Sequence, residues 1–210
     1  MTELDIISTV KPFTMTSGKN ILATVHAINV VDQGIPGDIV ECGVWRGGHI
    51  IAAMLAASVS RTYWLYDTFD GMVEPGPWDY RRGIHATETT AYKKRGIKNW
   101  CNASLFEVQH NIARFQNPTQ TIHYIVGDVV ETLTTEPAPT QIAVLRLDTD
   151  FYESTKAELQ HLWPKVVSGG VLIVDDYFSW DGCRRACDEF FTSDTKFEHI
   201  DGPAVRYIKP

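Results

Sequence analysis

The sequence is short of cysteine, of surplus positive charge and of long apolar runs, and each shortage argues against a class of protein. Of its four cysteines only Cys183 and Cys187 lie at a zinc-like spacing, and no second cysteine or histidine cluster accompanies them, so we interpret all four as reduced thiols. The formal net charge of −7 argues against a dedicated nucleic-acid binder, which would present basic residues to phosphate groups. No apolar run approaches the ~20 residues that a membrane span needs, and the first residues lack the pattern of a signal peptide. We therefore expect a soluble cytoplasmic protein with no nucleic-acid or membrane partner.

The 210 residues do contain a regular alternation of short apolar runs with amphipathic stretches, which is typical of an α/β protein with a parallel sheet. There is no repeat and no interdomain linker, so residues 1–210 are predicted to form a single domain. Strands are expected at 37–43, 62–67, 121–127, 141–148 and 169–176, and helices at 17–33, 47–58, 102–115, 152–167 and 180–192, with a short helix after residue 128. The closing runs "KFEHI" and "AVRYIKP", joined by a Gly-Pro turn, predict an antiparallel hairpin at the sheet edge. The predicted fold class is a doubly wound, mostly parallel seven-stranded α/β sheet, Rossmann-like, with an antiparallel C-terminal edge hairpin.

The run "VECGVWRGGH" lies between the first predicted strand and the helix that follows it. In a doubly wound sheet, ligands bind at the carboxyl ends of the strands, where glycines let the backbone approach them. A dinucleotide fingerprint needs a second glycine two residues after Gly43, but Trp45 stands there and would block a pyrophosphate. The pattern of Glu41, Gly43, Gly47 and Gly48 resembles instead the first motif of S-adenosylmethionine (SAM) methyltransferases, in which the acid faces the methionyl ammonium group. For this run alone, a purely structural turn remains the alternative.

Residues at the ends of two further strands strengthen the cofactor interpretation. Asp67 ends the second predicted strand about 20 residues after the glycines, where an acid can accept hydrogen bonds from ribose hydroxyls. Gly127 and Asp128 end the third, where methyltransferases often contact the adenine. The alternatives are a helix cap or loop acid for Asp67 and an N-cap for Asp128. Because three strand ends carry these signals in the expected order, we predict that the cofactor is SAM.

Acidic residues also follow the fourth and fifth predicted strands, at Asp148, Asp175 and Asp176. These two strands are expected to be neighbours ~4.8 Å apart, so the three carboxylates should converge at one edge of the cofactor pocket. Without a counter-charge they would repel one another, and a hard divalent cation such as Mg²⁺, which prefers oxygen ligands, would relieve the repulsion. Asp150 lies close by and is expected to be a solvated cap, although a part in the site stays open for it.

The runs "GVWRGG", "YDTFDGM", "LRLDTDFYEST" and "LWPKVVSGGVLIVDDY" together resemble the macrocin O-methyltransferase family, over residues 10–208. The resemblance implies the class I SAM methyltransferase fold and a metal-dependent enzyme that methylates sugar hydroxyls of macrolide and aminocoumarin antibiotics. It also implies that Asp148, Asp175 and Asp176 hold magnesium and that Asp148 is the general base.

Two segments receive an expected role from their positions. Residues 10–34 lie where the family has a cofactor-contacting N-terminal segment, which makes Thr14, Met15 and Thr16 candidate cofactor contacts. Residues 71–98 form a long connection with several glycines and prolines and little regular period, and they leave the sheet beside Asp67. A connection of this length is uncommon unless it is functional, so we predict a lid over SAM and the acceptor.

The expected reaction is Mg²⁺-dependent transfer of a methyl group from SAM to a hydroxyl of a small molecule with adjacent hydroxyls, a sugar diol of a glycosylated natural product. The metal would lower the pKa of the bound hydroxyl, and Asp148 would take its proton. The alternatives are a catechol-type enzyme with aromatic gates from "GPWDY" (76–80), a SAM-binding module without catalysis, and His85 or His123 as the base. Trp45 disfavours an NAD-dependent oxidoreductase. The sequence leaves open the identity of the acceptor, the regiochemistry and the oligomeric state, a homo-oligomer included.

Overall fold

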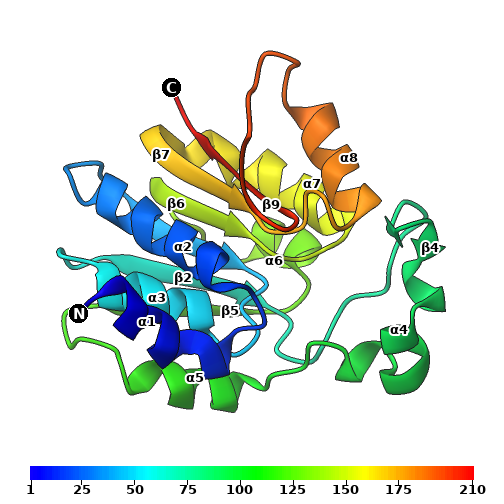
Figure 1. The fold of residues 1–210 in the computed structure, drawn as a ribbon, viewed down its shortest axis with the longest axis horizontal. Coiled ribbons are helices and arrows are strands. Elements are labelled where there is room, and N and C mark those ends of the chain that lie inside the picture. The colour runs from blue at the N-terminus through cyan, green and yellow to red at the C-terminus, as the bar shows by residue number, and fades with distance from the viewer.

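The computed structural model describes residues 1–210, and its centre is a seven-stranded sheet with the strand order β5-β2-β1-β6-β7-β9-β8 (Figure 1). Five strands run parallel: β1 (Asp38–Cys42), β2 (Thr62–Asp67), β5 (Thr121–Val126), β6 (Ile142–Leu147) and β7 (Val166–Val174). Strand β9 (Ala204–Ile208) runs antiparallel to β7, and β8 (Glu198–Asp201) runs antiparallel to β9. The predicted fold class and the C-terminal edge hairpin are therefore confirmed.

Helices cover both faces of the sheet (Figure 1). One face packs against α1 (Glu3–Val10), α2 (Gly18–Val31), α3 (Gly48–Ala56) and α5 (Leu105–Ala113), and the other against α6 (Val129–Thr135), α7 (Tyr152–His161) and α8 (Asp181–Phe190). The apolar side chains between the sheet and its helices form two clusters of 25 and 23 buried residues, so both faces of the sheet are buried. This explains why the central strands read as nearly continuous apolar runs. Every residue of β6 is buried, although one of them is Arg146.

The strand order reverses between β1 and β6, because β2 and β5 lie on one side of β1 while β6 and β7 lie on the other. At such a switch point the loops leave the carboxyl ends of two neighbouring strands in opposite directions, and a ligand can bind between them. The loops after β1 and β6 contain the glycine run and Asp148, respectively. The fold therefore brings two of the predicted sites to one place.

The largest boundary differences from the sequence prediction lie on both sides of Pro164. The helix expected at 152–167 ends at His161; residues Trp163–Lys165 form a 3₁₀ turn, η4, and β7 already begins at Val166. Pro164 accounts for the early end, because it lacks an N–H and restricts the residue before it. The sequence did not predict α1, whose N-terminus is closed by reciprocal hydrogen bonds between Thr2 and Asp5, a capping box.

The connection at 71–98 contains short regular elements. A two-stranded sheet pairs β3 (Tyr80–Arg81) with β4 (Ile84–His85), and the helix α4 (Thr90–Arg95) is flanked by the 3₁₀ turns η2 (Ala86–Glu88) and η3 (Ile97–Asn99). In Figure 1 this segment lies at the side of the sheet, with β4 and α4 farthest from the centre.

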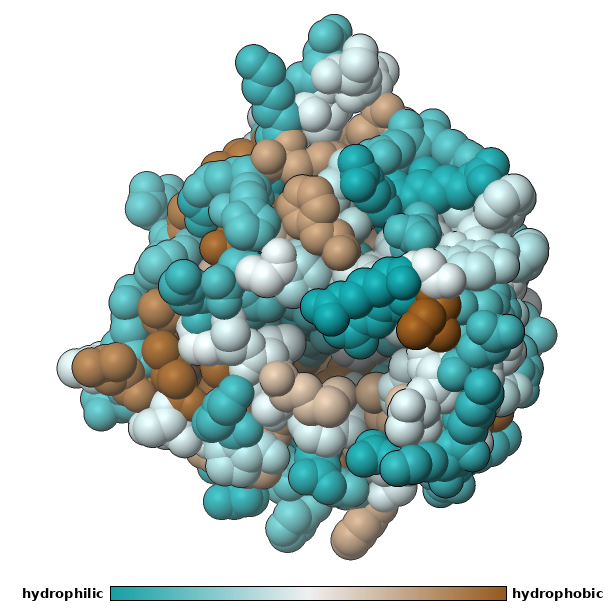
Figure 2. All heavy atoms as spheres, turned by 45° about the vertical axis from the view of Figure 1, so that its right-hand side comes forward, coloured by the Kyte–Doolittle hydropathy of each residue, from teal (hydrophilic) through white to brown (hydrophobic).

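The surface agrees with the acidic, polar composition of the chain. On the face shown in Figure 2, hydrophilic residues predominate and apolar residues form only small groups. None of the helices combines the length and the apolar character that a bilayer crossing needs.

Candidate active site

A cavity of about 470 Å³ is lined by residues at the carboxyl ends of the parallel strands, by the N-terminal segment and by the C-terminal hairpin. It contains twelve of the thirteen predicted site residues: Thr14, Met15, Thr16, Glu41, Gly43, Gly48, Asp67, Gly127, Asp128, Asp148, Asp175 and Asp176. The thirteenth, Gly47, caps α3 with a φ of 89° and does not line the cavity. A Cβ at Gly47 would lie 3.1 Å from the Ile112 side chain, so any larger residue here would crowd α5.

Two glycines of the loop after β1 are required by close backbone contacts. Gly43 has a φ of 81°, and a Cβ there would lie 2.0 Å from the backbone carbonyl oxygen of Asp148. A Cβ at Gly48 would lie 2.7 Å from the carbonyl oxygen of Phe13. The first glycine lets the loop cross the end of β6, and the second lets the N-terminal segment lie on the start of α3.

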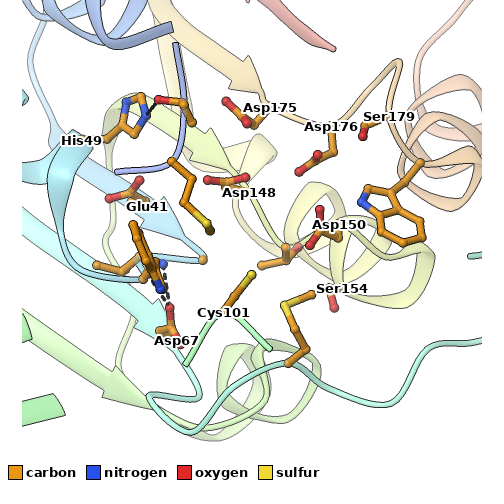
Figure 3. A pocket seen from close by; sticks show the side chains of 18 of the residues that line it. Glu41, His49, Asp67, Cys101, Asp148, Asp150, Ser154, Asp175, Asp176 and Ser179 are labelled. Atoms are coloured by element: carbon orange, nitrogen blue, oxygen red, sulfur yellow. Dashed lines mark hydrogen bonds between the residues drawn. The ribbon is translucent and has the colours of Figure 1, made fainter. Parts of the chain in front are cut away.

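The carboxylate of Asp67 fixes this glycine loop. Its Oδ2 accepts hydrogen bonds from the backbone N–H groups of Val44 and Trp45, at 2.7 and 3.0 Å (dashed in Figure 3), and its Oδ1 accepts one from Phe69 at 2.8 Å. Burial raises the pKa of Asp67 although these bonds oppose the shift. The corresponding acid of the next strand end, Asp128, is the N-cap of α6 and accepts from Val130 N–H at 2.9 Å.

The N-terminal segment is tied to α3 through a buried histidine that the sequence prediction did not include. His49 Nε2 bonds to the Thr16 hydroxyl at 2.9 Å, and its Nδ1 bonds to the Thr24 hydroxyl at 2.7 Å. The Thr14 and Thr16 hydroxyls are 3.0 Å apart, whereas Met15 is mostly exposed. Burial, with the nearby positive charge of Arg146, holds the pKa of His49 well below its ordinary value, so the imidazole is neutral. His49 thus positions the threonines without adding charge to the cavity.

The three predicted metal ligands converge. Asp148, Asp175 and Asp176 each place a carboxylate oxygen within 4.8 Å of the others, and their side chains lie around a common space in Figure 3. Asp176 Oδ2 is buried without a hydrogen-bond partner, which is costly unless a cation or a donor meets it. An all-oxygen donor set of this kind suits a hard divalent cation. The residues present therefore fit Mg²⁺.

One premise of the sequence argument for the metal is wrong, because the carboxylates do have a counter-charge. Arg146 Nη1 donates to Asp148 Oδ2 at 2.7 Å and to Glu41 Oε1 at 2.9 Å, and its Nη2 donates to Asp175 Oδ1 at 2.7 Å. Burial alone would lower the pKa of Arg146, but the carboxylates of Asp148, Asp175 and Glu41 raise it, so the guanidinium stays charged. The sequence did contain a signal for these ion pairs, because an arginine inside the buried strand "IAVLRL" needs partners for its charge.

The carboxylates outnumber this one cation, and their pKa values reflect it. Burial raises the pKa of Glu41 to about 8, although Arg146 opposes the shift. Burial and the charge of Asp148 raise the pKa of Asp175 to about 7. Burial and the charge of Asp150 raise the pKa of Asp176 well above its ordinary value.

Asp150, which was expected to be a solvated cap, lines the cavity with the other acids. It has a φ of 67°, a left-handed conformation that is rare outside glycine, and burial with the charge of Asp148 raises its pKa to about 7. Asp150 therefore belongs to the same electrostatic unit as Asp176, and the solvated-cap expectation is wrong.

Neither histidine that was considered as an alternative base lines the cavity. His85 bonds to Thr87 and to the carbonyl oxygen of Gly76 within the segment 71–98, and His123 stacks on Trp64 with ring centroids 4.0 Å apart. Both have structural contacts where they are. His49 does line the cavity, but both of its ring nitrogens bond to threonine hydroxyls, so the carboxylates are the basic groups that remain available.

The segment 71–98 is anchored by a fully buried carboxylate, Asp79. Its Oδ1 accepts the backbone N–H of Tyr152, the first residue of α7, at 2.8 Å, and its Oδ2 accepts Gly76 N–H at 2.6 Å. A Cβ at Gly182 in α8 would lie 2.0 Å from Asp79 Oδ1, so α8 leaves the space that this side chain occupies. The hairpin after Asp79 is therefore docked on α7 and α8.

The model of the family described as Macrocin-O-methyltransferase (TylF) matches residues 9–209 of the chain. The chain belongs to this family. The predicted resemblance is therefore confirmed, and the match includes the glycine loop, the acidic cluster and the C-terminal hairpin.

Individual family members differ in how much of their length the chain covers. Demethyldecarbamoylnovobiocin O-methyltransferase of Streptomyces niveus is 37% identical over 166 residues, which is 77% of this chain and 61% of that protein. The 8-demethyl-8-(2,3-dimethoxy-alpha-L-rhamnosyl)-tetracenomycin-C 4'-O-methyltransferase of Streptomyces olivaceus is 35% identical over 185 residues, 84% of this chain and 67% of that protein. The matched regions thus span 61% and 67% of these two relatives. Among solved structures, the O-methyltransferase NovP matches with a TM-score of 0.79 and 31% identity, over 94% of this chain and 82% of that one.

Proposed function

We propose that this protein transfers a methyl group from SAM to a hydroxyl of a small-molecule acceptor, with Mg²⁺ held by Asp148, Asp175 and Asp176. The observation that carries the proposal is that these carboxylates line the same cavity as the glycine loop. A cofactor held at the loop and an acceptor held at the carboxylates would then be neighbours. Membership of the macrocin O-methyltransferase family supports the same chemistry.

On the cofactor side, we assign Glu41 to the methionyl ammonium group of SAM, because its Oε2 is buried without a partner in the cavity wall. The three N–H groups on Asp67 leave about one of its lone-pair sites for a ribose hydroxyl. The other assigned contacts are Thr14, Met15, Thr16, Gly43, Gly48, Gly127 and Asp128.

On the acceptor side, the proposed base is Asp148. Mg²⁺, when bound, lowers the pKa of a hydroxyl that it coordinates. The Asp148 side chain is 27% exposed, and its Oδ1 lies outside the contact with Arg146. Both proposed roles therefore fall on Oδ1, which would hold the metal with one lone pair and accept the hydroxyl proton with the other. With SAM bound, the acceptor oxygen would form a bond to the methyl carbon while the carbon–sulfur bond breaks, and the electron pair of the carbon–sulfur bond would stay on sulfur. The products are a methyl ether and S-adenosylhomocysteine (SAH).

The proposed acceptor is a sugar diol of a glycosylated natural product. The name of the Streptomyces olivaceus relative includes a rhamnosyl group, which supports this class. The catechol alternative needs an aromatic gate from residues 76–80, but Trp78 lies outside the cavity and stacks under the Arg185 guanidinium, 3.6 Å from its ring centroid. Trp100 and Trp180 line the cavity instead, but both are buried, and the Arg81 guanidinium lies over the Trp180 ring.

For the segment 71–98 we propose a lid that moves only in its outer part. Asp79 keeps the hairpin docked, whereas α4 has no buried residue and only Ala91 and Tyr92 pack partly against the core, so α4 is the part that would close over the ligands. Limited proteolysis checks this: cleavage should concentrate at 87–96 and slow when SAH, Mg²⁺ and acceptor are present. Cleavage there that ignores the ligands would contradict the lid.

The proposed reaction is tested by metal removal and by one isosteric substitution. Chelation by EDTA should abolish methyl transfer to a rhamnoside and leave SAH binding by calorimetry nearly intact, and Mg²⁺ should restore turnover. Asp148→Asn should lose turnover with SAH binding retained. Full activity in excess EDTA would exclude the metal, and full activity of Asp148→Asn would exclude the base. A panel of rhamnosides and catechols, assayed under the same conditions, distinguishes the two acceptor classes.

A further inference from the structure

Arg146 contacts carboxylates at the ends of three adjacent strands. It stands in β6, in register with Glu41 of β1 and with Ile173 of β7, and it is 3% exposed. The guanidinium bonds to Glu41, to Asp148 just after β6 and to Asp175 just after β7, all within 2.9 Å. In the proposed function, the first of these acids belongs to the cofactor site and the other two belong to the metal site. A single side chain therefore connects the two sites.

The guanidinium bonds to only one oxygen of each partner carboxylate. It takes Oε1 of Glu41, Oδ2 of Asp148 and Oδ1 of Asp175, one from each carboxylate. The second oxygen of Glu41 is buried without any partner, and so is Oδ2 of Asp176. Glu41, Asp148 and Asp175 thus each have one oxygen fixed by the guanidinium and a second oxygen outside that contact.

The balance of charges also indicates that Arg146 satisfies these acids only in part. When ionised, Glu41, Asp148, Asp175 and Asp176 carry four negative charges, and Arg146 supplies one positive charge. Three negative charges of these four acids are therefore left without a protein counter-charge from Arg146, and Asp150 adds a further acid to the same cavity. Arg146 therefore compensates part of the charge permanently, and the rest is left for the two ligands.

We propose that Arg146 is a positioning residue shared by the cofactor site and the metal site, which sets the place of the ammonium-binding and cation-binding oxygens relative to each other. The inference rests on the proposed function, since it assigns Glu41 to SAM and the aspartates to the metal. Arg146 itself does not line the cavity, so it would act through the acids that it holds. Its role depends on the planar fork of a guanidinium, which can hold carboxylates on two sides at once, whereas a lysine ammonium is a single point charge.

The test is Arg146→Lys, which keeps the buried positive charge and removes the fork. Mn²⁺ is the metal probe, followed by electron paramagnetic resonance, and SAH is the cofactor probe, followed by calorimetry; both are measured below the melting temperature of each variant. We expect Mn²⁺ affinity to fall about tenfold or more, as for other groups that orient metal ligands. SAH affinity should fall about tenfold, the equivalent of one misplaced charge-assisted hydrogen bond. The spectrum of bound Mn²⁺ should broaden because its ligands are less uniformly placed.

Arg61→Lys is the matched control. Arg61 is also buried and bonds to Asp32 and to backbone carbonyl oxygens, but it lies outside the cavity, just before β2 begins. It should lower the melting temperature and leave both affinities unchanged. Two further variants separate the sites: Glu41→Gln should weaken SAH alone, and Asp176→Asn should weaken Mn²⁺ alone.

Each outcome of these measurements either supports or contradicts the shared role of Arg146. Loss of both affinities in Arg146→Lys, with neither lost in Arg61→Lys, supports the shared role. Unchanged affinities, a loss of only one, or equal losses in Arg61→Lys overturn it. If the unaltered protein fails to bind Mn²⁺, the metal part of the proposed function is wrong and the shared role falls with it; that outcome needs no variant, so the two failures are distinguishable.

Discussion

The carboxylate of Asp67 accepts a hydrogen bond from the backbone N–H of Trp45 at 3.0 Å, across 22 positions of sequence. Trp45 has a φ of 45°, a conformation that bulky residues rarely adopt, so this bond stabilises a strained turn. The acid that ends β2 thus shapes the loop that follows β1.

Asp67→Ala should therefore affect both the loop and the cofactor. Each lost hydrogen bond to the carboxylate is worth about 1.5–3 kcal/mol, so SAH affinity should fall at least about tenfold and the melting temperature should also fall. Hydrogen exchange should become faster at residues 44 and 45. Asp128→Ala is the control for the loop alone, because Asp128 lines the same cavity but its carboxylate accepts only the backbone N–H of Val130, so exchange at residues 44 and 45 should stay unchanged. If Asp67→Ala leaves exchange in the loop unchanged, the carboxylate acts on the cofactor alone.

Gly43→Ala should destabilise the protein far more than its φ of 81° alone requires. A left-handed alanine costs about 1–2 kcal/mol, but the new Cβ would also lie 2.0 Å from the Asp148 carbonyl oxygen. Gly83→Ala isolates the first cost, because Gly83 has a φ of 75° and nothing within 4 Å of its Cβ position. Urea denaturation of both variants measures the difference in the free energy of unfolding. Equal losses of stability would show that the loop moves away from the Asp148 carbonyl oxygen without a further cost.

Asp79→Ala should loosen the docked hairpin. It removes acceptors for Tyr152 and Gly76 N–H groups, the first at the start of α7, where loss of a cap costs about 0.5–2 kcal/mol. Hydrogen exchange should rise through residues 76–85, and the apparent KM for the acceptor should rise more than kcat falls. The control is Asp70→Ala, since Asp70 is exposed and pairs only with Lys98. Unchanged exchange at 76–85 would mean that other contacts hold the hairpin.

Glu158→Gln should make stability less dependent on pH. Glu158 is fully buried on α7, its Oε2 lacks a partner, and burial raises its pKa to about 8 from the ordinary 4.5. The folded protein therefore holds the proton more tightly than the unfolded chain, and the stability that this contributes is complete below pH 4.5 and lost as the pH rises to about 8. Gln cannot ionise, so the variant should gain in melting temperature over the unaltered protein between about pH 5 and about pH 9. The exposed Glu153→Gln on the same helix should show no such trend, and a constant difference for Glu158→Gln would contradict the raised pKa.

The sequence predicted the features that depend on local pattern. The apolar runs located the five parallel strands, because buried parallel strands are apolar on both faces. The acids Asp67, Asp148 and Asp175 could be placed at one end of the sheet because they follow strands that end at the same edge. The family match then confirmed the resemblance that these motifs indicated.

The features that the sequence missed depend on contacts between distant segments. Arg146 was read as part of an apolar strand, and only the neighbouring strands show that its partners are Glu41 and Asp175. His49 was one residue of a helix, whereas its role comes from Thr16 and Thr24 in the N-terminal region. Such pairings across the fold leave no spacing signal in one sequence.

The rim of the cavity contains residues from both ends of the chain, and the ribosome synthesises them at different times. Ser17 donates a hydrogen bond to Asp201 at 2.7 Å, across 184 positions of sequence, and Asp201, Gly202 and Pro203 line the cavity with the N-terminal segment. During translation, β7 has an unpaired edge until β9 emerges from the ribosome, and this side of the cavity cannot close before that. A nascent chain of this protein therefore carries its glycine loop and its acidic cluster for some time before it has a complete place to hold a ligand.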